Sequence, residues 1–293
     1  MNLIQNLKSQ KLIQPPEFLA DNIQYLVHMG SFAYGASTES SDIDIYGWCI
    51  PPKEDIFPHL RGEIFGFGRQ KKRFEQWQQH HIKTQDGNKE YDFSVYSIIK
   101  YFQLVMENNP NMIDSLFVPQ RCILHCTQVG DLVRENRKLF LHKGVWPKFK
   151  GYSFSQKSKM INKNPEGERK KIIDEFGYDV KFALHLVRLL NEVEQIMIEG
   201  DLDIERNAEQ LKSIRRGEWT LEQVIEYFNT KERNLETLYT SSTLRWGPDE
   251  KVIKELLLKC LEHHYGSLDK CIVKETTVAE VIDAIQETIN RFR

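Results

Sequence analysis

Two aspartates in the first fifth of the chain, Asp42 and Asp44, are spaced to act together. Alternate side chains of a β-strand point to the same face, so both carboxylates would lie on one side of a strand and Ile43 and Ile45 on the other. Like charges this close raise each other's proton affinity, and a cation relieves the repulsion. Magnesium suits the pair because it prefers oxygen ligands and commonly takes one or two protein carboxylates together with substrate phosphates. The pattern predicts a Mg²⁺ site that Mn²⁺ could also fill.

Gly30 and Ser31 precede this pair and are suited to hold a phosphate. Glycine lets the backbone approach a ligand closely, and free N–H groups at the start of a turn or helix bind anions. The Ser31 hydroxyl adds a further donor. A phosphate site beside a metal site is what nucleotidyl transfer requires, because the triphosphate is gripped while metal neutralises charge during in-line displacement.

Lys181, His185 and Arg188 are spaced at i, i+4 and i+7, and therefore share one face of a predicted helix. Such a polar stripe opposite apolar residues is usually a solvated face. With Tyr178 beside it, the stripe could instead contact a nucleotide, Lys181 as a point charge for the triphosphate and His185 as a hydrogen-bond donor. Both interpretations stay open.

Residues 142–171 carry nine basic side chains against two acidic ones, a local charge of +7, although the whole chain has a net charge of -2. Trp146, Phe149, Tyr152 and Phe154 are interleaved with them. Basic residues with aromatics suit single-stranded nucleic acid, through phosphate contacts and base stacking. The alternative is a lysine-rich connection whose aromatics belong to the core.

The elements that must position these residues change in character along the chain. Strands are expected at 23–29, 42–50, 63–67, 76–83 and 91–96, with a hairpin turn at Asp86-Gly87 and a helix over 98–107. From about residue 177 the spacing is helical, and further helices are expected at 204–214, 220–237, 249–263 and 277–292. We predict an N-terminal domain of mixed α and β structure (1–145) and a helical domain (146–293), with 142–171 as the connecting stretch.

Composition narrows the class of protein. The 293 residues are 40% hydrophobic, and no stretch approaches the ~20 apolar residues that span a bilayer. Five cysteines without a C-x-x-C pair, and no signal-peptide pattern, favour a reduced, cytoplasmic protein. The missing G-x-x-x-x-G-K-[ST] loop excludes a P-loop ATPase. His80-His81 lacks the spacing of zinc ligands and is expected to pack in the interior. The oligomeric state cannot be predicted.

The order Gly30-Ser31, a spacer and then Ser41-Asp42-x-Asp44 resembles the signature of the DNA polymerase β-type nucleotidyltransferases. Within that superfamily the chain is similar to the RNA repair pathway polymerase β family (RlaP) of bacteria and phages. Further matches are Ala33-Tyr34-Gly35, Asn109-Pro110, Leu116-Phe117, Gly177-Tyr178-Asp179-x-Lys181, His185, Arg188-Leu189-Leu190 and Gly217-Glu218-Trp219. Tyr46 departs from the basic residue expected in many relatives.

The resemblance implies an α+β fold, in which a polymerase β-type nucleotidyltransferase domain with a mixed sheet and flanking helices precedes a helical domain. It also implies a third carboxylate on a neighbouring strand, beside Asp42 and Asp44. Asp92 is the candidate, and Glu90, on the same face of a regular strand, competes with it. The nucleotide would be bound by Gly30, Ser31, Ser41, Lys181 and His185.

We therefore expect a nucleotidyltransferase (EC 2.7.7 type) that moves an NMP from an NTP, ATP among the candidates, to an acceptor hydroxyl and releases pyrophosphate. The resemblance and the basic stretch favour an RNA end as acceptor, with tRNA one option. One alternative is a protein adenylyltransferase of the antitoxin type. Another is a non-catalytic nucleotide- or RNA-binding module with a degenerate site.

Overall fold

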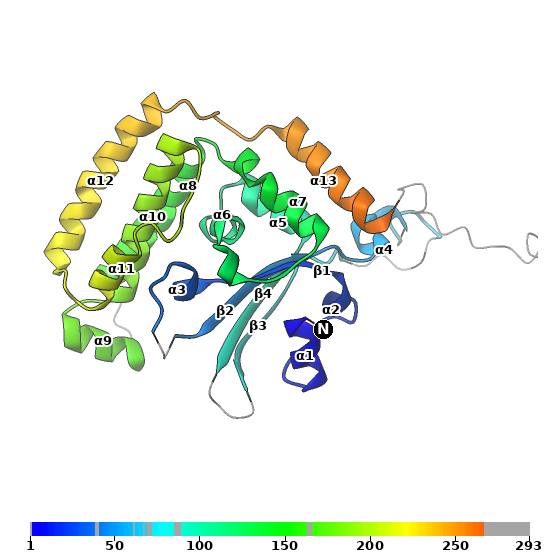
Figure 1. Cartoon of the computed structure of the whole chain (residues 1–293), viewed down its shortest axis with the longest axis horizontal. Helices are drawn as coiled ribbons and strands as arrows, with labels where there is room; N and C mark the ends of the chain where they lie inside the picture. Colours follow the sequence, from blue (N-terminus) through cyan, green and yellow to red (C-terminus); the bar gives the residue numbers. More distant parts are fainter. Residues whose placement is uncertain are drawn as a thin grey trace, which may run out of the picture.

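The centre of the molecule is a mixed β-sheet (Figure 1). The computed structural model describes residues 2–38, 41–60, 62–66, 68, 72–84, 89–162 and 166–266. Within them the strands are β1 (Ile23–His28), β2 (Ile43–Cys49), β3 (Gln76–Lys83), β4 (Glu90–Ser97) and β5 (Ile123–Cys126). Their order is β3-β4-β2-β1-β5, and β2 runs parallel to β4 while the other neighbouring pairs are antiparallel. The sheet is therefore mixed, as expected.

Each face of the sheet is covered by a different set of elements. One face packs on α1 (Leu3–Ser9) and α2 (Leu19–Asn22), through a small core that includes Leu7, Leu26 and Phe93. The other face carries α5 (Ile98–Met106), α6 (Pro110–Phe117) and α7 (Gln128–Glu135). Ser97 and Asn109 begin α5 and α6 by accepting a hydrogen bond from a backbone N–H of the first turn.

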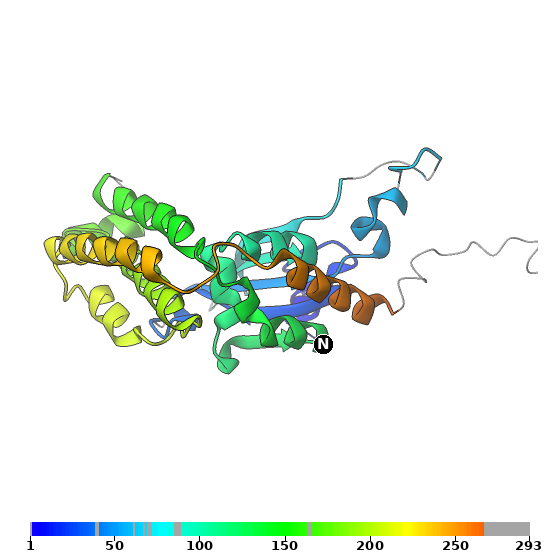
Figure 2. The ribbon, with the colours of Figure 1, turned by 90° about the horizontal axis from the view of Figure 1, so that it is seen from above.

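The second half of the chain is helical. Its elements are α8 (Val145–Asn162), α9 (Glu168–Phe176), α10 (Val180–Glu199), α11 (Ala208–Arg215), α12 (Leu221–Ser241) and α13 (Glu250–Tyr265). α10 is buried along most of its length because it packs against α8, α11 and α12. α13 returns to pack on α7 (Figure 1). Seen from above, the helices α8–α12 gather at one end of the molecule and the sheet lies beside them (Figure 2).

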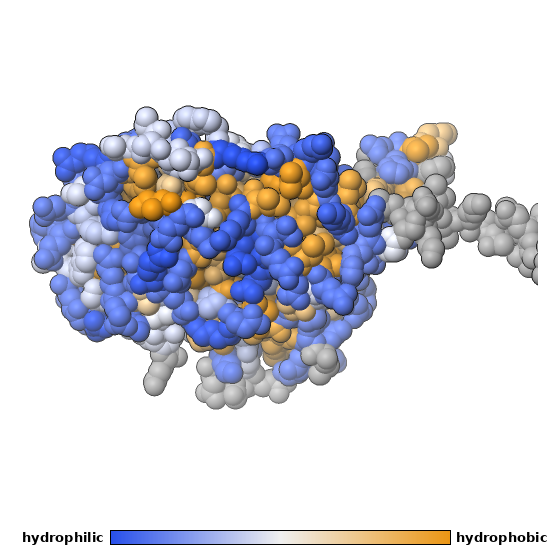
Figure 3. All heavy atoms as spheres, turned by 45° about the horizontal axis from the view of Figure 1, so that its top comes forward, coloured by the Kyte–Doolittle hydropathy of each residue, from blue (hydrophilic) through white to orange (hydrophobic). Residues whose placement is uncertain are grey.

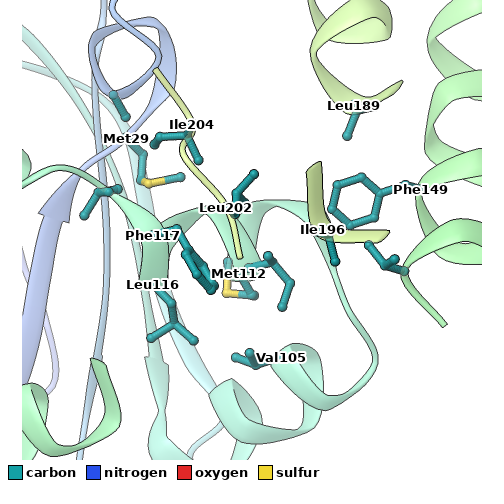
Figure 4. Packing of buried hydrophobic residues seen from close by; sticks show 14 of the residues in the cluster. Met29, Val105, Met112, Leu116, Phe117, Phe149, Leu189, Ile196, Leu202 and Ile204 are labelled. Carbon is teal, nitrogen blue, oxygen red and sulfur yellow. The ribbon is translucent and has the colours of Figure 1, made fainter. Parts of the chain in front are cut away.

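A continuous hydrophobic core connects these two parts. Figure 4 shows Leu202 and Ile204, from the segment between α10 and α11, placed between Met29 and Phe117 of the N-terminal part and Ile196 of α10. All five side chains belong to one buried cluster. The core therefore crosses the boundary predicted between residues 145 and 146, and a division into two domains at that point stays a prediction.

Short elements complete the connections. They are α3 (Gly30–Ala33), α4 (Lys53–Ile56) and the 3₁₀ turns η1 (Pro58–Leu60), η2 (Gln120–Cys122) and η3 (Arg137–Phe140). α3 lies between the sheet and the helices α10 and α11 in Figure 1. It therefore stands where the two parts of the molecule meet.

Two sequence expectations are corrected. Residues 63–66 form turns rather than a strand, and β3 pairs with β4 instead. The stretch 142–171, expected to be a connection, contains α8 and the first residues of α9, and α8 buries Val145, Phe149 and Met160. The expected turn at Asp86-Gly87 and the helix at 277–292 lie outside the described residues.

The surface is largely hydrophilic. On the face shown in Figure 3, hydrophilic residues dominate one end and hydrophobic residues gather nearer the middle. Large apolar side chains that stay exposed include Ile198 and Trp246. Within the described part of the chain, no helix combines the length and the hydropathy needed to cross a membrane.

Candidate active site

Three aspartates meet at one end of the two parallel strands. Asp44 of β2 lies directly opposite Asp92 of β4 in the strand register. Residues opposite each other in neighbouring strands project from the same face, so these two carboxylates stand side by side. Asp42 comes one residue before β2, is exposed, and is two positions from Asp44 on the same side. The structure thus brings together the three carboxylates that the sequence singled out.

The charges of these carboxylates act on one another. Burial, followed by the neighbouring charges of Asp92 and Asp42, raises the pKa of Asp44 to about 6. His80 opposes this effect only weakly, since it is the last of the contributors. Repulsion among acidic groups that share one edge of a sheet is relieved by a cation, so the electrostatics fit a divalent metal ion.

The donor set suits one kind of metal better than another. In the described residues no ready-made group of three or more His, Cys, Asp or Glu side chains is placed to hold a metal ion. A closed structural centre needs four protein ligands, whereas magnesium commonly uses one or two carboxylates and completes its shell with water and substrate phosphates. A magnesium ion at the edge formed by Asp44 and Asp92 would therefore need water or substrate oxygens for the rest of its shell.

The structure separates Asp92 from its competitor Glu90. The His81 backbone N–H donates to Asp92 Oδ1 over 2.7 Å, and His80 Nδ1 lies 3.6 Å from the same oxygen. Glu90 instead contacts the His81 ring at 2.6 Å and Lys83 at 3.8 Å. Asp92 is thus the carboxylate opposite Asp44, while Glu90 is occupied by side chains of β3.

The placement of His80 and His81 was missed by the sequence reasoning, which expected packing residues. Both are exposed, because the register of β3 and β4 shifts between Gln79 and Ile82. His81 also has a φ of 57°, in the left-handed region. A bulge of this kind redirects side chains at the edge of a sheet. Two adjacent histidines on the strand facing Asp92 were the available signal.

Gly30 lies against the carboxylates. A Cβ built on Gly30 would come within 1.9 Å of Asp44 Oδ2, and its φ of +63° is one that favours glycine. The Met29 backbone N–H donates to the Asp44 backbone oxygen over 2.7 Å, which fixes the approach of the two segments. Ser31 follows, half-buried, in the single turn of α3. The predicted phosphate-binding residues are therefore adjacent to the predicted metal-binding ones.

Cationic side chains gather around His185 on the other side of α3. Burial, together with the charges of Arg188, Arg169, Lys181 and Arg215, lowers the pKa of His185 to about 3. His185 is therefore a neutral hydrogen-bonding group at neutral pH. Two of these cations, Arg169 and Arg188, are paired with acids. Lys181, which is exposed, and Arg215 form no ion pair with any described residue.

Arg188 does not lie on a solvated face, nor is it exposed to contact a nucleotide. It is 5% exposed and pairs with Asp114 of α6 and, at 2.9 Å, with Glu192. The Tyr34 hydroxyl donates to Asp114 Oδ2 over 2.8 Å, and the guanidinium of Arg188 lies 4.2 Å from the centre of the Tyr34 ring. This group, called below the buried ion cluster, ties the segment after α3 to α6 and α10.

Arg215, at the end of α11, was also missed. Its guanidinium donates to the Ala36 backbone oxygen at 2.5 Å, to Thr38 Oγ1 at 3.2 Å and to Ser41 Oγ at 3.1 Å. Ser41, predicted to bind nucleotide, is thus joined to the helical region next to Asp42. The sequence signal was weak, since Arg215-Arg216 looks like the ordinary basic end of a helix.

Several lysines of the stretch 142–171 bind side chains of the same molecule. Lys148 pairs with Glu107 at 2.9 Å, and Lys150 with Glu232 at 3.1 Å and with Glu236. Lys157 donates to the Asn229 side chain over 3.2 Å. Trp146 and Phe149 are buried, whereas Tyr152 and Phe154 are exposed. The packing alternative therefore accounts for a good part of this stretch.

Comparison with known proteins shows the family to which the chain belongs. Residues 4–246 match the model of the RNA repair pathway DNA polymerase beta family, RlaP, and the chain belongs to this family. A solved structure similar to the chain is the nucleotidyltransferase-like protein from Exiguobacterium sibiricum 255-15, at 11% identity and a TM-score of 0.28, covering 97% of this chain and 90% of that one. Comparison with curated proteins gave no match. The family resemblance and the fold class expected from the sequence are confirmed.

Proposed function

We propose that the protein transfers a nucleotidyl group from a nucleoside triphosphate to an acceptor hydroxyl, with release of pyrophosphate. The observation that carries the proposal is the register that sets Asp44 against Asp92, beside Gly30. Family membership supports nucleotidyl transfer in general. The acceptor we favour is an RNA end, and the support for it is the RNA repair family itself.

The aspartates would bind and orient the reacting groups. Asp42, Asp44 and Asp92 would hold divalent metal, and Asp92 would also face the acceptor hydroxyl. Magnesium, when bound, neutralises charge on the triphosphate and its leaving group. The acceptor oxygen forms a bond to the α-phosphorus while the bond between that phosphorus and the bridging oxygen breaks. Pyrophosphate leaves with the electron pair, and the hydroxyl proton passes to Asp92 or to water.

The triphosphate would lie between α3 and α10. Gly30 and Ser31 would offer backbone and hydroxyl donors to the β- and γ-phosphates. Lys181, exposed and without a recorded acidic partner in the described residues, would supply a positive charge. His185 would donate a hydrogen bond as a neutral imidazole, which is the form that its lowered pKa favours.

A labelled-nucleotide assay tests this function. Each of the four NTPs, labelled at the α-phosphate, is incubated with the protein, magnesium and either RNA or a cell lysate. We expect label in RNA, and none with the double variant Asp42→Ala/Asp44→Ala, whose fold is checked by circular dichroism. Label in protein instead would indicate an adenylyltransferase of the antitoxin type. Nucleotide binding without transfer, or persistent transfer by the double variant, would contradict the proposal.

A further inference from the structure

Asp42 is the least supported of the three aspartates. It is exposed and precedes β2, so the hydrogen-bond ladder between β2 and β4 does not hold it. Ser41, which directly precedes it, is joined to Thr38: the Ser41 N–H donates to the Thr38 oxygen at 3.0 Å, the Thr38 N–H donates to Ser41 Oγ at 2.9 Å, and the two hydroxyls lie 3.2 Å apart. Hydrogen bonds of this kind contribute about 1 kcal/mol each, so contacts from other parts of the chain add to how firmly Thr38 and Ser41 are held.

Arg215 supplies those contacts from a distant part of the chain. Its guanidinium reaches three oxygens of this segment, those of Ala36, Thr38 and Ser41, which are 174 to 179 residues away in sequence. Arginine suits such a role because its planar fork donates several hydrogen bonds in fixed directions, whereas lysine presents a point charge.

The electrostatics of Arg215 are unusual for a purely structural residue. It is half-buried, and every acceptor recorded for it is a neutral oxygen, with no acidic partner among the described residues. A half-buried cation without a counter-charge is costly to keep. Its three hydrogen bonds to Ala36, Thr38 and Ser41 are what the structure offers against this cost.

We propose that Arg215 is a positioning residue: it holds Thr38 and Ser41 and thereby sets Asp42 for nucleotidyl transfer. The inference rests on the proposed function. It assigns α11 a part in catalysis, since a shift of α11 would move Asp42. Outer-shell partners of metal-binding residues typically contribute 10- to 100-fold to metal affinity or activity.

The variants Arg215→Ala and Arg215→Lys test the inference, with Arg216→Ala as matched control. Arg216 is the exposed neighbour that pairs with Glu218. We expect Arg215→Ala to lower kcat about 10- to 100-fold while the KM for NTP changes less than about threefold. Arg215→Lys should recover part of the loss, and Arg216→Ala should behave as wild type. In a double-mutant cycle with Ser41→Ala, the two effects should be less than additive.

Two results would overturn the inference. The first is a kcat for Arg215→Ala within about twofold of wild type; the second is a large rise in KM with kcat unchanged, which would make Arg215 a nucleotide ligand. Hydrogen exchange of peptides covering residues 36–44 gives a readout that needs no activity. Exchange should be faster in Arg215→Ala than in Arg216→Ala, and equal exchange would overturn the inference even if wild type transferred nothing. If wild type transfers no nucleotide but exchange is still faster in Arg215→Ala, only the proposed function is contradicted and the positioning role of Arg215 stands.

Discussion

Two groups of carboxylates in the molecule differ in the positive charge that surrounds them. At the edge of β2 and β4, Asp42, Asp44 and Asp92 raise the local negative charge without a strong internal counter-charge. In the buried ion cluster, Asp114 and Glu192 share Arg188 between them. Repulsion within the first group is opposed only weakly, by His80, whereas the second group contains an arginine that pairs with both acids.

The difference indicates which charges are structural and which are functional. The buried ion cluster joins the segment after α3 to α6 and α10, and so fixes how the helices sit against the sheet. Its compensation is incomplete, because Asp114 Oδ1 and Arg188 Nε have no hydrogen-bond partner among the described residues. The aspartate edge has no such bridging role. Substitutions should therefore affect stability at one group and activity at the other.

The largest effect on stability is expected from Arg188→Met. Removal of the guanidinium leaves two buried carboxylates unpaired, and breaking a buried ion pair typically costs about 3–5 kcal/mol. Urea unfolding should show a loss of this size. Arg206→Met, at an exposed pair with Glu199, should change the unfolding free energy far less, because solvent screens this pair. Equal losses in the two variants would erase the distinction between buried and exposed pairs.

The comparison of Asp92→Asn with Glu90→Gln tests which carboxylate of β4 takes part in nucleotidyl transfer. The strand register sets Asp92, not Glu90, against Asp44, so Asp92→Asn should lower the rate of transfer about 10²- to 10³-fold. Glu90→Gln should stay within about threefold of wild type, since Glu90 contacts His81 and Lys83. Steady-state assays with labelled NTP measure both. The reverse order would make Glu90 the third carboxylate.

The effect of Asp44→Asn on stability should be smaller and opposite in sign. In the folded protein the pKa of Asp44 is about 6, above its ordinary value of 3.8, so the folded state binds this proton more tightly than the unfolded state. Charged Asp44 then costs stability at pH values above 6, and the cost disappears as the pH falls from 6 to 3.8.

In metal-free buffer at pH 8, Asp44→Asn should therefore raise the free energy of unfolding by about 1 kcal/mol, and the gain should vanish near pH 4. The exposed Asp174, for which no partner is recorded in the described residues, provides the control variant Asp174→Asn. Thermal unfolding at several pH values measures the difference. A destabilised Asp44→Asn at pH 8 would mean that the carboxylate has an internal partner.

Much of the fold could be predicted because local patterns determined it. β2 and β4 formed within a residue or two of the expected ranges, and α12 and α13 followed their helical spacing. α8 was missed because its lysines outweigh the apolar residues that it buries, and α9 because none of its described side chains is buried. β5 was missed because a four-residue strand carries little pattern, and its pairing with β1 is a tertiary contact.

The site residues, too, divide into those that local spacing predicts and those that depend on tertiary contacts. Asp42, Asp44 and Gly30 could be found because their spacing along one segment already implies their chemistry. The position of Asp92 needed the family resemblance, since strand register depends on the whole sheet. Arg215 could not be predicted at all, because its contacts with Thr38 and Ser41 join segments more than 170 residues apart.

The most direct test of the aspartate edge is the binding of a non-hydrolysable NTP, measured by calorimetry with magnesium and with EDTA. For wild type, magnesium should strengthen binding at least about tenfold, a change of about 1.4 kcal/mol. For Asp44→Asn/Asp92→Asn, the affinities with and without magnesium should be nearly equal. If the affinity of wild type for the NTP does not change with magnesium, the claim that these carboxylates bind a metal ion together with the nucleotide is contradicted.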